Sequence, residues 1–391
     1  MFTIQTLNNI AKIGIEQLPT DNYSISNEAK APDAVLVRSF NMHELELSSN
    51  LKAIARAGAG VNNIPVEKCT EKGIVVFNTP GANANAVKEL ILGFLLASSR
   101  NIIEGVAWAK TLKGQDGISK LVEAGKKKFV GTEIKGKRLG IIGLGAIGGL
   151  VANDALALDM EVMGFDPYVS VETAWRLSRQ VQRATNIEQI FATCDYITIH
   201  VPLLDSTKGM LDENAFKAMK KGVRIFNFSR GELVNEDALE NAIQEGIVAK
   251  YITDFPNDRV LGMENVIPVP HLGASTVESE ENCAIMAARE LKDYLETGNI
   301  RNSVNYPNAV LPYVGKRRIT VLHQNVPNMV GRISAALAEH NINIADMVNR
   351  SKGTYAYTII DIDNALDSNI KAGIADKIQT IPGVAAVRII K

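Results

Sequence analysis

The sequence has few cysteines, almost no net charge and no long apolar run. Its three cysteines, Cys69, Cys194 and Cys283, are far apart and odd in number, which is typical of neither a disulfide framework nor a metal-ligand cluster. We therefore expect a reducing, cytoplasmic location and no bound metal. The formal net charge of −1 gives no global electrostatic reason to bind nucleic acid or an acidic membrane surface. No apolar run reaches the roughly 18 residues of a membrane span, and no basic segment followed by an apolar core opens the chain, so we expect neither a membrane anchor nor a signal peptide.

The most informative stretch is an apolar strand, residues 138–142, that leads into a glycine turn. Its glycines have the spacing G-x-G-x-x-G, in which the first makes the turn, the second lets the backbone approach a pyrophosphate, and the third lets helix pack on strand. The helix that follows offers free N–H groups and a positive dipole end to phosphates. Glycine turns also arise for purely steric reasons, so the pattern needs support from its context. The candidate cofactor-binding residues here are Gly143, Gly145, Ala146, Ile147 and Gly148.

Asp166 supplies that context. It ends a second apolar strand, residues 161–165, and lies 21 residues beyond Gly145. A carboxylate at this spacing binds the ribose hydroxyls of the adenosine and repels a 2′-phosphate, and no arginine follows immediately. The sequence therefore predicts NAD rather than NADP as cofactor. The alternative role for Asp166 is that of a turn residue before Pro167.

Apolar strands alternate with helical segments along most of the 391 residues, too many for one ordinary core. We predict an α/β fold with two doubly wound, Rossmann-like parallel-sheet domains and a C-terminal ferredoxin-like βαββαβ domain. A mostly apolar helix from residue 84 to about 109 is expected to cross between the first two domains and to contribute to a subunit interface. The expected boundaries are a discontinuous substrate-binding domain (1–83 and 275–307), a dinucleotide-binding domain (84–274), a linker (308–316) and the third domain (317–391).

Polar residues follow several strands, at the sheet edges where α/β proteins bind ligands. Arg38 and Arg56 follow two N-terminal strands and could clamp an anionic substrate through bidentate bonds; surface salt bridges are the alternative. Arg230, an acid near residue 258, and His271 follow strands of the dinucleotide domain. Removing a hydride from a secondary alcohol also releases a proton, which a histidine can accept, while an arginine binds the carboxylate and polarises the carbonyl. A histidine after a proline is more often structural, but the presence of an arginine, an acid and a histidine after strands of one domain favours a catalytic role. His200, at another strand end, is expected to be structural or to support the cofactor loop.

Three segments together resemble the D-2-hydroxyacid dehydrogenase family: residues 143–148, 227–234 (N-F-S-R-G-E-L-V) and 270–276 (P-H-L-G-A-S-T). Further segments, 37–39, 56–63, 78–80 and 127–133, are similar to the branch of that family that oxidises 3-phosphoglycerate. The resemblance implies a catalytic role for Arg230, Asp258 and His271. It also implies cofactor contacts from Pro202, Ser229 and Asp254, and substrate contacts from Arg38, Ser39, Arg56, Gly58 and Asn83.

The chain departs from the family pattern at the third catalytic residue. The family reads D-V-F-x-x-E-P, whereas this chain has D-F-P-N-D-R from Asp254 to Arg259, one residue shorter and with aspartate in place of glutamate. Asp258 is therefore the candidate acid beside His271, and Glu264 is the other nearby acid.

The last 75 residues resemble an ACT regulatory domain. His323, Asn325 and Asn343 match positions that bind L-serine in serine-inhibited members, and their donors and acceptors suit a zwitterionic amino acid. ACT units pair side by side, which implies a homo-oligomer, either dimer or tetramer. The alternative is an ACT unit that only joins subunits.

Three functions remain open from the sequence. The first is NAD-dependent oxidation of 3-phosphoglycerate, opening L-serine synthesis and restrained by serine. The second keeps this chemistry with glycerate, lactate or another 2-hydroxy acid, which Arg38 and Arg56 disfavour. The third is an NAD-sensing binding module of the corepressor type, which the presence of both Arg230 and His271 disfavours.

Overall fold

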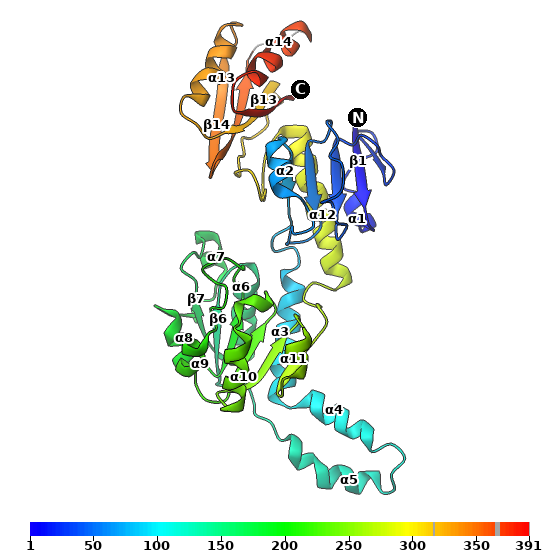
Figure 1. Cartoon of the computed structure of the whole chain (residues 1–391), viewed down its shortest axis with the longest axis vertical. Coiled ribbons are helices and arrows are strands. Elements are labelled where there is room, and N and C mark those ends of the chain that lie inside the picture. The colour runs from blue at the N-terminus through cyan, green and yellow to red at the C-terminus, as the bar shows by residue number, and fades with distance from the viewer. Residues whose placement is uncertain (316, 364–367, 391) are drawn as a thin grey trace. The chain divides into compact units, whose positions relative to one another are not determined.

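A computed structural model describes residues 1–315, 317–363 and 368–390. Residues 316, 364–367 and 391, which belong to the predicted linker and third domain, lie outside the described residues. The chain divides into two compact units, one of Met1–Asn83 with Val277–Lys391 and one of Ala84–Thr276 (Figure 1).

The first unit contains a parallel five-stranded sheet in the order β2-β1-β3-β4-β5. The long helix α12 (Val277–Thr297) packs on β3, β4 and β5. Its inward face is built from small residues, including Ala284, Ala287 and Ala288, which let the helix lie close to the sheet. The other elements are β1 (Phe2–Leu7), α1 (Lys12–Ile15), β2 (Tyr23–Ser26), β3 (Ala34–Val37), β4 (Ala53–Arg56), α2 (Val66–Glu71) and β5 (Val75–Phe77).

The second unit is built on a parallel seven-stranded sheet in the order β12-β11-β10-β9-β6-β7-β8. The order reverses between β6 and β9, and ligands of such sheets bind at the carboxyl ends of the strands at this reversal. The strands are β6 (Arg138–Ile142), β7 (Glu161–Phe165), β8 (Gln182–Arg183), β9 (Tyr196–Ile199), β10 (Val223–Asn227), β11 (Val248–Thr253) and β12 (Val266–Pro268). The helices between them are α6 (Ala146–Ala157), α7 (Val171–Arg176), α8 (Ile187–Thr193), α9 (Glu213–Ala218), α10 (Glu236–Gln244) and α11 (Asp258–Gly262).

The expected single helix from residue 84 is two helices, α3 (Ala84–Ser99) and α4 (Ile102–Thr111), with a bend of 62° between them. Asn101 adopts a left-handed conformation (φ 49°) at the break, which asparagine tolerates. With α5 (Ile118–Gly125), α4 projects from the sheet as a hairpin (Figure 1). Among the described helices none is by itself long and apolar enough to cross a membrane, and only this bent pair passes that test jointly.

The C-terminal residues of the first unit form an antiparallel sheet in the order β14-β15-β13-β16. Its elements are β13 (Arg317–Gln324), α13 (Met329–Ala338), β14 (Ile344–Lys352), β15 (Tyr355–Ile362), α14 (Ser368–Gln379) and β16 (Val384–Ile390). This βαββαβ order, with the two parallel sheets, confirms the predicted fold class.

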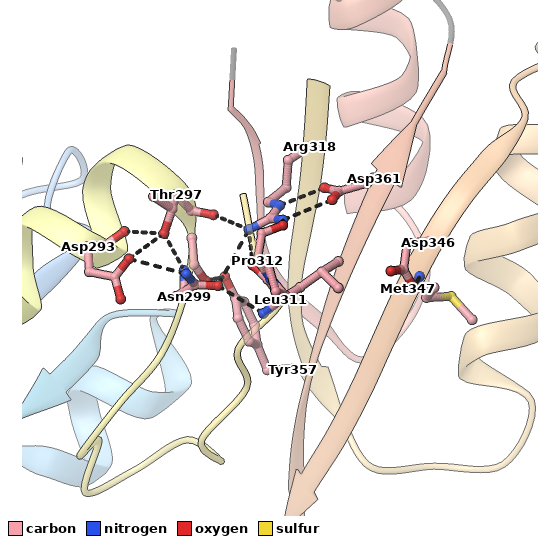
Figure 2. A network of polar contacts seen from close by, with 11 residues as sticks. Asp293, Thr297, Asn299, Leu311, Pro312, Arg318, Asp346, Met347, Tyr357 and Asp361 are labelled. Carbon is pink, nitrogen blue, oxygen red and sulfur yellow. Dashed lines mark hydrogen bonds and ion pairs between the residues drawn. The ribbon is translucent and has the colours of Figure 1, made fainter. Parts of the chain in front are cut away.

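Arg318 joins this antiparallel sheet to the end of α12 (Figure 2). Its fully buried guanidinium donates to both carboxylate oxygens of Asp361, with Nε–Oδ1 at 2.6 Å and Nη2–Oδ2 at 2.9 Å. Nη1 also donates to the carbonyl oxygens of Thr297 and Leu311, at 2.8 and 3.0 Å. Arg388 donates to the carbonyls of Tyr294 and Leu295. Of these acceptors, the carbonyls of Leu295 and Thr297 belong to the last turn of α12, where backbone carbonyls lack partners within the helix.

Candidate functional site

The glycine turn has the geometry that a dinucleotide requires. Gly143 has φ +92°, and a Cβ there would lie 2.5 Å from the carbonyl oxygen of His200. A Cβ on Gly148 would lie 2.0 Å from the carbonyl oxygen of Gly143, so the helix packs too closely for any side chain. A Cβ on Gly145 would meet nothing within 4 Å, which leaves the backbone open where a pyrophosphate approaches. Ala146 and Ile147 follow as the first two residues of α6.

Asp166 lies at the end of β7 and contacts the glycine turn. Its Oδ2 accepts a hydrogen bond from the backbone N–H of Leu144 at 2.9 Å, and Oδ1 accepts one from Tyr168 at 2.8 Å. Each carboxylate oxygen can accept a further bond. The bond from Tyr168 fits the alternative role of Asp166 as a turn residue before Pro167, and the bond from Leu144 ties the same side chain to the glycine turn. The contact with ribose hydroxyls stays a prediction.

The ends of β9 and β10 hold the other predicted cofactor residues. Ser229 Oγ donates to the carbonyl of Ile199 at 2.7 Å, and the Pro202 carbonyl accepts from Thr207 Oγ1 at 2.6 Å. His200 Nε2 lies 2.9 Å from Thr198 Oγ1. Burial lowers the pKa of His200 to about 3, so the ring is neutral, and it is the backbone carbonyl of His200 that approaches Gly143 of the glycine turn.

Arg230 and His271 both lie next to one aromatic ring, that of Phe255. The Arg230 Cζ is 6.0 Å from the centroid of Phe255, and the His271 ring centroid is 5.0 Å from it. Arg230 follows β10, Phe255 follows β11, and His271 follows β12, so three neighbouring strands place them at one edge of the sheet. The His271 side chain is exposed, as a group that exchanges a proton with a substrate must be.

Asp254 is the carboxylate that interacts with both residues. It is 1% exposed; Oδ2 accepts from the Gly273 N–H at 3.0 Å, and Oδ1 is buried with no hydrogen-bond partner among the described residues. Burial raises the pKa of Asp254, while the Gly273 N–H and the charges of His271 and Arg230 oppose that rise. A buried acceptor without a partner fits a cofactor amide, which supplies N–H donors.

Asp258 lies on α11, the short helix that follows β11. It is the first residue of α11, its side chain is exposed, and among the described residues it makes no hydrogen bond or ion pair. The two residues beside Asp258 interact with other groups. Asn257 caps the N-terminus of α11, and Arg259 forms ion pairs with Asp237 and Glu240. The pairing of Asp258 with His271 stays a prediction, and so does the alternative, Glu264.

The predicted substrate residues belong to the first unit. Arg56 Nε donates to the Arg38 carbonyl at 3.0 Å, and a Cβ on Gly58 would lie 2.4 Å from Arg56 Nη1. Glycine at 58 thus makes room for the guanidinium. The backbone N–H of Ser39 donates to Asn8 Oδ1 at 3.0 Å, and Asn83 is the last residue of the unit's N-terminal part.

The predicted effector residues lie at two ends of the antiparallel sheet. His323 is buried, with Nδ1 2.8 Å from the Gln324 carbonyl and Nε2 2.8 Å from Thr358 Oγ1. Asn325 donates to the Gly353 carbonyl at 3.3 Å, near the β14–β15 turn. Asn343 precedes β14, whose first residue pairs with the last residue of β15. Within one chain, Asn343 therefore lies at the opposite end of the sheet from His323 and Asn325.

Sequence reasoning missed two contributors. Phe255 was only part of a departure from the family pattern, although its position after a buried strand and before a proline could have singled it out. Glu280, which pairs with Arg38, lies 242 residues away in the sequence and gave no signal. Among the described residues no cluster of three or more His, Cys, Asp or Glu side chains could hold a metal ion.

A doubly wound parallel sheet with this glycine turn at the reversal of strand order defines a dinucleotide-binding α/β protein. Residues 92–273 match the family described as D-isomer specific 2-hydroxyacid dehydrogenase, NAD binding domain. Residues 92–273 are therefore an NAD-binding domain of the D-isomer specific 2-hydroxyacid dehydrogenase type, and the prediction of NAD as cofactor is confirmed at the level of that domain.

Similar proteins carry the name D-3-phosphoglycerate dehydrogenase. The one from Methanocaldococcus jannaschii is 36% identical over 328 residues, which cover 82% of this chain and 60% of that protein. The one from Homo sapiens is 40% identical over 267 residues, which cover 67% of this chain and 48% of that protein. The crystal structure of the NAD⁺-bound 3-phosphoglycerate dehydrogenase of Entamoeba histolytica is 28% identical, has a TM-score of 0.61, and covers 79% of this chain and 99% of that one. The chain spans only 60% and 48% of the two curated relatives.

Proposed function

We propose that the protein is an NAD-dependent dehydrogenase that oxidises 3-phospho-D-glycerate to 3-phosphohydroxypyruvate, the first step of L-serine biosynthesis. The observation that carries this proposal is the grouping of Arg230, Asp254 and His271 around Phe255, at the sheet edge where the glycine turn also lies. The names of its relatives support the substrate, as do the two guanidinium groups at the strand ends of the first unit.

In this proposal His271 Nε2 accepts the proton of the substrate hydroxyl as the carbonyl forms. Arg230 binds the α-carboxylate and stabilises the negative charge that develops on the carbonyl oxygen. Asp254 stabilises the imidazolium through its charge and offers Oδ1 to the cofactor amide. Bound NAD supplies the hydride acceptor. Arg38 and Arg56 hold the phosphate end, where a guanidinium offers bidentate bonds.

We further propose that the C-terminal sheet is an ACT domain that binds L-serine between two copies of the chain. The exposed strand β14 pairs only with β15 among the described strands, and its other edge is open along nine residues. An open edge is a template for pairing with a second chain. Antiparallel pairing of two β14 edges would bring His323 and Asn325 of one copy toward Asn343 of the partner subunit.

Exposed apolar side chains on the projecting hairpin support a homo-oligomer as well, namely Ile102, Ile103, Val106 and Ile118. A cytoplasmic location belongs to the same proposal, since all three cysteines are free and buried.

A steady-state assay of NADH formation tests the function directly. Using NAD with 3-phosphoglycerate, D-glycerate or D-lactate, we expect the highest kcat/KM for 3-phosphoglycerate and inhibition by L-serine. A higher kcat/KM for an unphosphorylated acid would instead assign another substrate. No NADH from any of them at pH 7 to 9 would overturn the proposal and favour a binding module.

A further inference from the structure

Arg38 forms an ion pair with a carboxylate of its own unit. Its Nη2 lies 2.5 Å from Oε1 of Glu280, which belongs to the first turn of α12. The two side chains are 39% and 42% exposed, so both can reach solvent. An ion pair this exposed contributes only about 0–1 kcal/mol, which makes it easy to exchange for another partner.

The groups around this pair carry both signs of charge. Arg56 is a direct neighbour, because its Nε donates to the Arg38 carbonyl. The Cys283 thiol, one turn along α12 from Glu280, interacts with both guanidinium charges, although burial is the larger influence and raises its pKa. The corner formed by β3, β4 and α12 thus holds two cations and one anion.

We infer that Glu280 competes with the anionic end of the substrate for Arg38 and so limits how tightly this corner binds a phosphate. This inference rests on the proposed function. A phosphate dianion, with three acceptor oxygens, can bind Arg38 and Arg56 together and displace the Glu280 carboxylate into solvent. A hydroxymethyl group offers no charge in exchange, so Glu280 keeps Arg38 when the substrate lacks a phosphate. Glu280 therefore weakens the binding of a phosphorylated substrate and leaves the binding of an unphosphorylated one unchanged.

The test compares Glu280→Gln with the wild type. Removing the competing charge should lower KM for 3-phosphoglycerate about two- to five-fold, the range set by the worth of an exposed ion pair. The kcat should not change, because Glu280 takes no part in the chemistry, and KM for D-glycerate should stay the same. A purely structural role would not produce this separation of KM from kcat and of one substrate from the other.

Glu278→Gln is the matched control, because Glu278 is exposed on the same turn of α12 and, among the described residues, forms no ion pair with Arg38. It should leave both KM values unchanged, and thermal unfolding should show that both variants fold. An unchanged or higher KM for 3-phosphoglycerate in Glu280→Gln would overturn the inference.

Calorimetric binding of 3-phosphoglycerate separates this inference from the proposed function. If the wild type produces no NADH, the proposed function fails, yet the inference still requires two- to five-fold tighter binding by Glu280→Gln. Equal binding by the two proteins would contradict it whether or not turnover occurs.

Discussion

Glu290, on α12, is a carboxyl group that its surroundings keep protonated at neutral pH. It is 8% exposed; Oε1 accepts from Asn302 at 2.7 Å, and Oε2 has no partner among the described residues. Burial raises its pKa from 4.5 to about 8. Between these pH values the folded protein keeps a proton that the unfolded chain releases. Stability therefore falls as pH rises through this window, by about 1.4 kcal/mol per pH unit.

Glu290→Gln should remove this dependence, because the amide oxygen can still accept from Asn302 and does not titrate. At pH 5 the variant and the wild type should unfold at similar urea concentrations. At pH 8.5 the variant should be more stable by about 3–5 kcal/mol, the full effect of the shift. Urea unfolding at both pH values measures the difference. An equal difference at pH 5 and pH 8.5 would show that the carboxyl group does not titrate as described.

At the scale of elements, helix α12 connects features that the sequence separates. It begins directly after the His271 segment, carries Glu280 in its first turn, and ends against Arg318 and Arg388 of the antiparallel sheet. Arg318 uses all three guanidinium nitrogens as donors, to Asp361 and to backbone carbonyls (Figure 2). A buried pair of this kind leaves an uncompensated charge when one partner is removed.

Arg318→Met should therefore destabilise the protein by about 3–5 kcal/mol, since Asp361 would remain buried and charged. The double variant Arg318→Met, Asp361→Leu should recover most of that loss, because no charge is then left unpaired. Arg332→Met is the matched control, since Arg332 is exposed on α13 and should matter by less than about 0.5 kcal/mol. The midpoints of urea unfolding measure these differences. Equal midpoints for Arg318→Met and Arg332→Met would rule out a stabilising role for the Arg318–Asp361 pair.

Elements with strong local signals could be predicted from the sequence. The buried strands β6, β9 and β10 are nearly continuous apolar runs, and the Gly143 turn has a fixed spacing. The break between α3 and α4 was not foreseen, because no proline or glycine marks it and a single asparagine in a left-handed conformation produces it. The pairing of Arg38 with Glu280 and the contacts of Phe255 with Arg230 and His271 depend on tertiary packing. Local pattern carries no information on such contacts.

At the scale of the whole molecule, the proposed serine site needs two copies of the chain. Asn325→Ala and Asn343→Ala should each weaken serine inhibition at least ten-fold, because each removes hydrogen bonds to a charged amino acid. Neither should change kcat in serine-free buffer. A mixed dimer of the two variants places both substitutions in one site and leaves the other intact.

Serine titration of that mixed dimer checks the arrangement. We expect half of the sites to bind serine with wild-type affinity, as measured by calorimetry on tagged, purified mixed dimers. If the mixed dimer binds no better than either variant alone, both asparagines act within one chain, and the proposed pairing of β14 edges is wrong.

The kinetics of His271→Asn test the central claim most directly, with His43→Asn as a control for an exposed histidine in the first unit. If His271 accepts the substrate proton beside Arg230 and Asp254, kcat for 3-phosphoglycerate should fall about 10²- to 10⁴-fold. The affinity for NADH should stay within two-fold of the wild type. A variant that retains wild-type kcat while His43→Asn is equally active would contradict the account.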